Sequence, residues 1–287
     1  MNIFINLIIL CITIFLYIHI YHHIKSSNYL EIYEIEKPSK DILEELCNLK
    51  QPLLIHNMDI MNIDFNYIVK NYKNFDIKIF NNENNRQNIS LNLETACDLF
   101  NKDISSIYIS ENNKDFLEET TLIKEFTYND IYFRPYNVSY MDYDIIFGSK
   151  NCYTKLKYNL NCRNFINVLN GKIEVTLCLP KNSKHLYVNK DYEELEFYSD
   201  INIHNIQDKY KDEFSKIKCL RIILEKNKVL QIPAYWFYSI KILEENSLIS
   251  ILKYRSIMNT IAILPELFMK FLQSNNIKIN LTKIINK

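Results

Sequence analysis

Short apolar runs separated by polar turn residues fill the second half of the chain. Phe165–Leu169 and Ile173–Leu179 lie on either side of Asn170-Gly171. Apolar runs of this length, bounded by turn signals, are typical of buried strands. Asn-Gly favours a type I′ turn, in which both central residues have positive φ, so we predict a hairpin here. Gly171 is one of only two glycines in the chain, and we therefore predict that this region is the centre of a β-barrel-like core.

The same pattern predicts eight strands between Tyr143 and Tyr254. A long polar insert, Ser183–Lys218, interrupts them and is expected to contain a helix near Ile206–Phe214. Short strands with turn signals between them are typical of jelly rolls and barrels. The predicted strands are Asp144–Phe147, Tyr153–Tyr158, Phe165–Leu169, Ile173–Leu179, Cys219–Leu224, Val229–Ile232, Trp236–Ile242 and Ser247–Tyr254.

The first half of the chain alternates between the helical and the extended period. Ser39 precedes an apolar-periodic stretch and is a good N-cap residue, and Pro265 suits the first turn of a C-terminal helix. The predicted helices are Lys40–Leu49, Leu93–Asn101, Asp115–Phe126 and Pro265–Gln273, and the predicted strands are Leu30–Ile35, Pro52–Ile55, Asp76–Phe80 and Ser106–Ser110.

The N-terminus is apolar over residues Ile3–Ile20, interrupted only by Asn6, Thr13 and His19. About 20 such residues cross a bilayer as a helix. No Lys or Arg precedes the run and no small-residue cleavage site follows it, so a retained anchor is favoured over a cleaved signal peptide. The alternative is a buried N-terminal helix, which would need a polar face that the run lacks.

The charges around this run predict which side of the membrane the rest of the chain occupies. Lys25, Lys37 and Lys40 follow the run, and the positive-inside tendency then predicts a cytosolic body. Three N-x-S/T sequons point to the opposite side, although an Asn-rich chain produces sequons by chance. They begin at Asn88, Asn137 and Asn280.

Composition narrows the range of partners and compartments. Lys plus Arg and Asp plus Glu both number 34, so the formal net charge is zero and no nucleic-acid partner is indicated. The heavy use of Asn, Ile, Lys and Tyr indicates an AT-rich genome. The cysteines are odd in number and form no C-x-x-C motif, which predicts free thiols in a reducing compartment. They are Cys11, Cys47, Cys97, Cys152, Cys162, Cys178 and Cys219.

Motifs at Thr154–Asn159, Asn170–Lys172 and Ile232–Tyr238 resemble those of the JmjC and cupin-like family of Fe(II)/2-oxoglutarate hydroxylases. Thr154–Asn159 occupies the place of the family pattern T-x-x-H-x-D, Asn170-Gly171-Lys172 that of its glycine-lysine step, and Ile232–Tyr238 that of I-P-x-x-W-x-H. The resemblance covers roughly Leu30 to Tyr254. It implies a mainly β fold, a double-stranded β-helix of the jelly-roll type, with flanking helices and the N-terminal transmembrane helix.

The three metal-ligand positions of the family are occupied here by other residues. The His, Asp and His ligands fall on Lys157, Asn159 and Tyr238. A facial triad of two imidazoles and a carboxylate holds Fe(II) and leaves room for 2-oxoglutarate and O₂. An ammonium cannot ligate, an amide ligates weakly, and a phenol is a poor Fe(II) ligand. We therefore expect no metal, no cofactor and no catalytic residue; an active enzyme would need Fe(II) and 2-oxoglutarate.

The resemblance also implies an anion pocket. Thr154 and Lys172 match the residues that hold the distal carboxylate of 2-oxoglutarate, and Tyr108 is a looser match. A dicarboxylate could then bind between Lys157 and Lys172. The alternative is purely structural: Lys157 pairs with Asp142 or Asp144, Asn159 caps a turn, Tyr238 fills the core and Lys172 is exposed. His185 and His204 are expected to be solvated loop residues.

These observations predict a membrane anchor over 1–25, an N-terminal α/β part over 26–140, a double-stranded β-helix over 141–256 and a helical tail over 257–287. The favoured function is a non-catalytic binding or scaffolding module, anchored through residues 3–20, with a protein partner and a homodimer contact through the C-terminal helix. The alternatives are an active Fe(II)/2-oxoglutarate hydroxylase or demethylase, and a structural membrane protein of a virus or protist.

Overall fold

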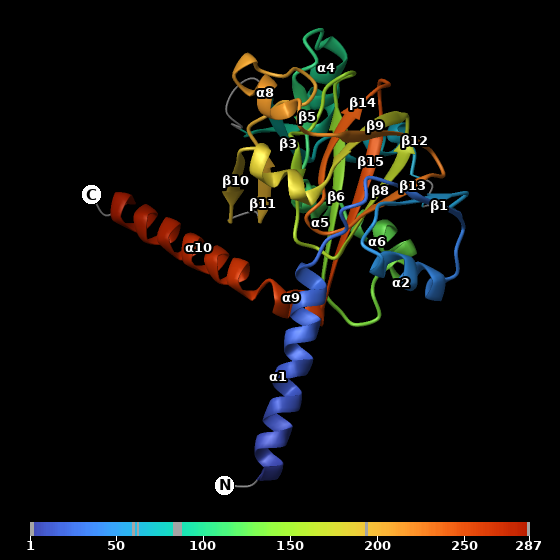
Figure 1. The fold of residues 1–287 in the computed structure, drawn as a ribbon. Coiled ribbons are helices and arrows are strands. Elements are labelled where there is room, and N and C mark those ends of the chain that lie inside the picture. The colour runs from blue at the N-terminus through green and yellow to red at the C-terminus, as the bar shows by residue number, and fades with distance from the viewer. Residues whose placement is uncertain (1–2, 59–60, 62, 83–87, 193–194, 286–287) are drawn as a thin grey trace.

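Two β-sheets form the body of the molecule (Figure 1). The computed structural model describes residues 3–58, 61, 63–82, 88–192 and 195–285. The larger sheet has nine strands in the order β1 (Tyr33–Glu36), β2 (Leu53–His56), β13 (Val229–Ile232), β8 (Arg163–Asn170), β15 (Leu248–Ser256), β6 (Val138–Gly148), β5 (Tyr108–Ser110), β3 (Asp76–Asn81) and β4 (Asn88–Asn92). The smaller sheet has six, in the order β10 (Val188–Asp191), β11 (Glu196–Ser199), β7 (Lys157–Tyr158), β14 (Phe237–Ile242), β9 (Lys172–Cys178) and β12 (Cys219–Glu225).

The central strands of the larger sheet are buried on both faces. One face packs on the smaller sheet, where Ile166 and Ile251 meet Val175 and Ile240 in one apolar cluster. The other face, which includes Phe147 and other aromatic side chains, packs under the helices. Burial on both sides explains why the central strands read as continuous apolar runs rather than as alternating ones. The β-rich class predicted from the sequence is confirmed.

The turn at Asn170-Gly171 does not close a hairpin within one sheet. β8 pairs with β13 and β15, whereas β9 pairs with β12 and β14, so the turn carries the chain from one sheet to the other. Gly171 has φ of +80°, but Asn170 does not have positive φ, and the predicted type I′ geometry is wrong. A Cβ on Gly171 would lie 2.2 Å from Ser247 Oγ and 2.9 Å from Ser247 Cα. Both the backbone conformation and the close approach therefore require glycine here.

The helices predicted over 40–49 and 93–101 are present with small changes at their ends, and the one predicted over 265–273 extends to Ile285. Ser39 caps the first of them, accepting a hydrogen bond from the Ile42 N–H. The helix predicted over 115–126 is broken in two at Thr121, which has φ of +60°. The described helices of this part are α2 (Lys40–Asn48), α3 (Phe65–Tyr72), α4 (Leu93–Lys102), α5 (Lys114–Glu119), α6 (Ile123–Phe126) and α7 (Asp130–Phe133), with a short 3₁₀ helix at Thr127–Asn129.

The polar insert adds two strands to the smaller sheet. Between a 3₁₀ helix at Pro180–His185 and the short helix α8 (Lys211–Phe214) lie β10 and β11, which the sequence pattern did not predict; a further 3₁₀ turn, Asp208–Tyr210, precedes α8. β11 pairs with β7. The predicted strand over 153–158 is shorter than expected: only Lys157–Tyr158 is a strand, and Tyr153 forms an isolated bridge.

A disulfide closes the base of this insert. Cys178 ends β9 and Cys219 begins β12; the two residues are directly opposite each other in the antiparallel pair, with Cα atoms 4.7 Å apart. The prediction that all seven cysteines are free is therefore wrong for these two. The prediction failed because the two cysteines are separated by 41 residues in sequence. Only the pairing of β9 with β12 brings them together. The other five cysteines are free.

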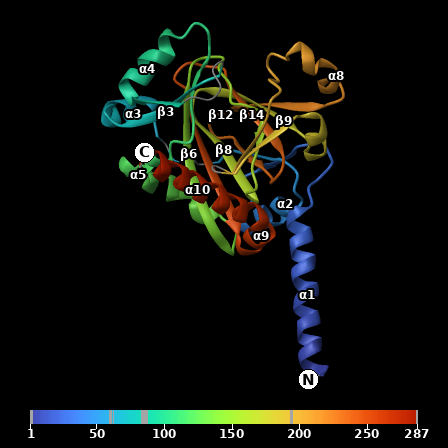
Figure 2. The same ribbon diagram turned by 90° about the vertical axis from the view of Figure 1, so that its left-hand side faces the viewer.

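Two long helices extend from the body (Figures 1 and 2). α1 (Ile3–Ile24) is long and apolar enough to cross a membrane, with a mean hydropathy of 2.6 and no buried residue. Its C-terminal end packs against α9 (Ile257–Ala262), which follows β15. α10 (Leu264–Ile285) continues from α9 and projects to the side of the body.

Candidate functional site

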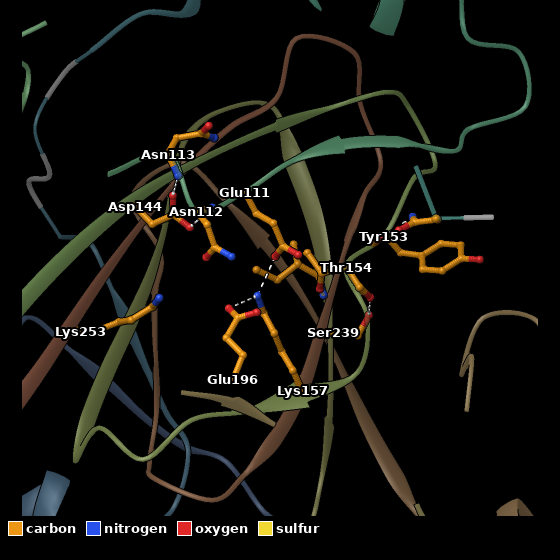
Figure 3. A network of polar contacts seen from close by, with 12 residues as sticks. Glu111, Asn112, Asn113, Asp144, Tyr153, Thr154, Lys157, Glu196, Ser239 and Lys253 are labelled. Atoms are coloured by element: carbon orange, nitrogen blue, oxygen red, sulfur yellow. Dashed lines mark hydrogen bonds and ion pairs between the residues drawn. The ribbon is translucent and has the colours of Figure 1, made fainter. Parts of the chain in front are cut away.

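Lys157 lies at the centre of a buried ion cluster between the two sheets. Its Nζ is 2.6 Å from Glu111 Oε2 and 2.9 Å from Glu196 Oε1, and all three side chains are less than a tenth exposed (Figure 3). The two carboxylates come from distant parts of the chain: Glu111 directly follows β5, and Glu196 begins β11 in the insert. The structural alternative named Asp142 or Asp144 as the partner of Lys157, whereas the carboxylates in contact with its ammonium are those of Glu111 and Glu196.

The register of the smaller sheet explains how these groups meet. β7 lies between β11 and β14, so that Lys157 is opposite Tyr198 on one side and Tyr238 on the other. Without the insert strand β11, the Lys157 ammonium would lack the Glu196 carboxylate. A buried charge without a partner is strongly disfavoured. The burial of Lys157 therefore depends on the insert, which supplies one of its two carboxylates.

A second polar group lies beside the first in Figure 3. Asp144 accepts hydrogen bonds from the backbone N–H groups of Asn112 and Asn113 at 2.9 and 2.7 Å. Burial raises the pKa of the Asp144 carboxyl despite these bonds and the charge of Lys253. Burial alone would lower the pKa of the Lys253 ammonium, but Asp142, 3.5 Å away, and Asp144 outweigh burial and raise it. Lys253 is therefore a permanent cation of this region.

The three positions that match the family's metal ligands line one cavity. Lys157, Asn159 and Tyr238 all contact a space of about 260 Å³, together with Arg255 and Lys253. The fold therefore brings these three residues together. Their chemistry depends on which of the three side chains are protonated and on which groups they contact.

Asn159 and Tyr238 are held as neutral groups. Asn159 Oδ1 accepts a hydrogen bond from the Asn161 N–H at 3.2 Å, as in a turn cap, while its Nδ2 has no partner among the described residues. Tyr238 is buried in the apolar cluster between the sheets. Burial raises the pKa of its phenol, and the nearby lysine charges lower it less, so the phenol stays protonated at neutral pH.

These residues do not fit the Fe(II) centre that the resemblance implies. The ammonium of Lys157 holds both nearby carboxylates, and Tyr238 offers a protonated phenol. Within the described part of the chain, no group of three His, Cys, Asp or Glu side chains is placed to hold a metal ion. A facial triad needs imidazole nitrogens and a carboxylate oxygen as ligands at these three positions.

The residues proposed for a 2-oxoglutarate carboxylate are not brought together. Thr154 is buried, and its Oγ1 accepts a hydrogen bond from the Ile240 N–H at 2.9 Å. The cavity of about 390 Å³ beside Thr154 contains neither Lys172 nor Tyr108. The Lys172 side chain is 36% exposed and lies 4.0 Å from Glu225. Lys172 therefore behaves as the exposed lysine of the structural alternative.

His204 is partly buried, contrary to the expectation of a solvated loop residue. Its ring lies against Tyr153 with centroids 4.6 Å apart, and its Nε2 is 3.0 Å from Ser239 Oγ. Because the Ser239 hydroxyl donates to the Thr154 carbonyl, His204 is the donor to Ser239. Burial, followed by the charges of Lys241 and Arg221, lowers the pKa of His204 to about 4. His185 lies near the surface, and its Nδ1 is 2.6 Å from Glu213 Oε2.

His204 makes stability depend on pH. Its pKa is about 4 in the folded protein and about 6.5 in an unfolded chain, so the unfolded state takes up a proton first as the pH falls. The stability is complete above pH ~6.5 and should decrease between pH ~6.5 and ~4, by about 1–2 kcal/mol once solvent screening is allowed for. Urea unfolding at several pH values measures this. His204→Gln should flatten the pH dependence of stability in that range.

Comparison with known proteins identifies the family that the chain resembles in sequence. The model of the cupin-like domain family matches residues 21–258, which include all fifteen strands found among the described residues. No curated protein matches the chain at a significant level.

Proposed function

This chain belongs to the cupin-like domain family, and from that premise we propose that it is a membrane-anchored, non-catalytic binding module. The observation that carries the proposal is the position of Lys157. Its ammonium, held by Glu111 and Glu196, stands where the family resemblance expects the first metal ligand. A fixed charge of +1 with two carboxylates is a stable electrostatic arrangement that leaves no ligand set for Fe(II).

The proposal includes a double-stranded β-helix for the core. In this fold, successive strands alternate between two facing sheets. The order β6–β15–β8–β13 in one sheet and β7–β14–β9–β12 in the other supports this topology. So does the turn at Gly171, which passes between the sheets.

The cavity beside Lys157 supports a small anion as the ligand. Arg255 is 7% exposed, its guanidinium lies 3.7 Å from the centre of the Tyr140 ring, and its Nε has no hydrogen-bond partner among the described residues. Asn159 Nδ2 is a second buried donor without a described partner. Arg binds carboxylates and phosphates through parallel N–H bonds, and Arg255 lines this cavity together with Lys157 and Lys253, which favours such a group. The anion site proposed at Thr154 and Lys172 is thus better placed at Arg255 and Asn159.

The proposal also covers the side of the membrane. The lysines after α1 favour a cytosolic body, but the Cys178–Cys219 disulfide is typical of an oxidising compartment. We favour the oxidising side, because a bond between two specific strands is a more direct indicator than three lysines. Alkylation of thiols in intact cells before lysis should then leave Cys178 and Cys219 unmodified; labelling of both would instead place the body in the cytosol.

One experiment separates the proposal from its alternatives. Full-length protein in detergent is tested anaerobically for Fe(II) and Mn(II) binding, and its melting temperature is measured with citrate, succinate and 2-oxoglutarate. We expect no metal at micromolar concentrations. An anion at ten times its Kd should raise stability by about 1.4 kcal/mol and the melting temperature by roughly 3–5 °C.

The controls identify the site. Arg255→Gln should abolish the anion effect, and Lys172→Gln should preserve it. One bound metal per chain would favour the hydroxylase alternative instead. Absence of both metal and anion effects would favour the structural membrane protein.

A further inference from the structure

A large cavity lies where the apolar helix α1 meets the body. It has a volume of about 630 Å³, more than twice that of the cavity beside Lys157. α1 contributes the side chains of Phe15, His19, His22 and His23 to its lining. The opposite wall comes from the body, including the start of α9, which packs against α1.

The lining carries an excess of positive charge. Lys25 and Lys50 form no ion pair among the described residues. Glu44 is the one carboxylate that the described residues contribute to the lining, and it is engaged by the guanidinium of Arg163, with one contact of 3.0 Å, and by Lys40 at 3.3 Å. Two lysines and three histidines therefore face this space without a described acidic partner.

Lys25 and Lys50 are held next to each other. Lys50 Nζ donates a hydrogen bond of 2.9 Å to the Lys25 carbonyl, which joins the end of α1 to the end of α2. Burial, and to a smaller extent the Lys25 charge, lowers the pKa of Lys50 to about 8. A bound anion would relieve this repulsion, because it offers an opposite charge to both ammonium groups.

The position of the cavity along α1 indicates where the anion would come from. The helix has 22 residues and no buried side chain, and at 1.5 Å per residue it is about 33 Å long, close to the thickness of a bilayer core. His19 to Lys25 then lie at the level of the lipid headgroups. Phe15, Ile257 and Met258 give the cavity an apolar side next to the charged one. Charged and apolar walls together match a phospholipid with its phosphate at the lysines and a chain along α1.

We propose that this cavity binds an anionic phospholipid, with Lys25 and Lys50 contacting its phosphate. The inference rests on the proposed membrane anchoring by α1. It is independent of the anion site at Arg255, which lies in a different cavity. A bound lipid would fix the angle between α1 and the body.

The single tryptophan of the chain provides a reporter. Trp236 Nε1 donates a hydrogen bond of 3.2 Å to the Lys50 carbonyl, so the indole lies directly behind this cavity. Full-length protein is reconstituted into phosphatidylcholine vesicles that contain an equal mole fraction of acyl-brominated phosphatidic acid or acyl-brominated phosphatidylcholine. Bromine quenches the indole only when the lipid is close.

We expect stronger quenching by the brominated phosphatidic acid, with a preference of about fivefold for each contributing lysine. Lys25→Gln should reduce the preference, and Lys25→Gln/Lys50→Gln should bring the ratio close to one. Lys211→Gln, an exposed lysine in α8, should leave it unchanged. Equal quenching by the two lipids in the unmodified protein, or a preference that survives the double substitution, would overturn the lipid site.

Two further outcomes distinguish failure of the membrane anchoring from failure of the lipid site. Failure of the protein to enter pure phosphatidylcholine vesicles would overturn the membrane anchoring itself. Equal quenching by the two lipids together with a rise in melting temperature caused by millimolar glycerol 1-phosphate would show that a soluble phosphate occupies the cavity, and would overturn the lipid as its ligand.

Discussion

Replacement of Lys157 by methionine should destabilise the folded protein by about 3–5 kcal/mol. The substitution leaves the carboxylates of Glu111 and Glu196 buried together without the ammonium that lies 2.6 and 2.9 Å from them. Both carboxylates lose most of their hydration on folding, and their mutual repulsion adds to that cost. Urea unfolding followed by circular dichroism measures the change in the free energy of unfolding.

Two further variants make the interpretation specific. Glu111→Gln/Lys157→Met/Glu196→Gln removes all three charges and should recover a large part of the loss, because an uncharged cluster needs no counter-charge. Lys73→Met breaks an exposed ion pair, 3.5 Å from Glu94, and should cost no more than about 1 kcal/mol. A similarly small cost for Lys157→Met would show that the cluster is open to water and would remove the main support for the proposed function.

Loss of the Cys178–Cys219 disulfide should cost about 4 kcal/mol of stability. The loop that it closes has a sequence separation of 41, and the loop-entropy relation gives roughly this value at 25 °C. Cys178→Ser/Cys219→Ser should unfold at a lower urea concentration than the unmodified protein.

Reductant provides the internal control for this prediction. Dithiothreitol should lower the stability of the unmodified protein to about that of the double variant and have no effect on the double variant itself. Cys97→Ser removes a free, buried thiol, so its difference between oxidising and reducing conditions should equal that of the unmodified protein. Equal stability of the oxidised and reduced unmodified protein would contradict the assignment of this bond.

The sequence allowed much of the fold to be predicted because its signals are local. Val229–Ile232 is a strand with the predicted bounds, and Ser39 caps α2 as expected. The alternation of strands between two sheets is not a local property. Asn170-Gly171 is a typical hairpin sequence. The strands on either side of it, β8 and β9, nevertheless belong to two different sheets.

The candidate site was only partly predictable for the same reason. A motif fixes the spacing of Lys157, Asn159 and Tyr238, so their common cavity could be expected from the sequence. The partners of Lys157 could not. Glu111 is 46 residues away, and Glu196 arrives on β11, which lies in a stretch that resembles a solvated loop. The protein partner and the homodimer contact through the C-terminal helix stay predictions.

The position of the disulfide has a consequence for proteolysis. The insert, Ser183–Lys218, begins shortly after Cys178 and ends directly before Cys219, so the bond joins the two segments that flank it. A protease that cuts once within the insert would therefore produce two polypeptides that stay covalently joined. They would migrate as one species on a non-reducing gel and separate on a reducing one, and the paired strands β9 and β12 would hold both fragments in one folded particle.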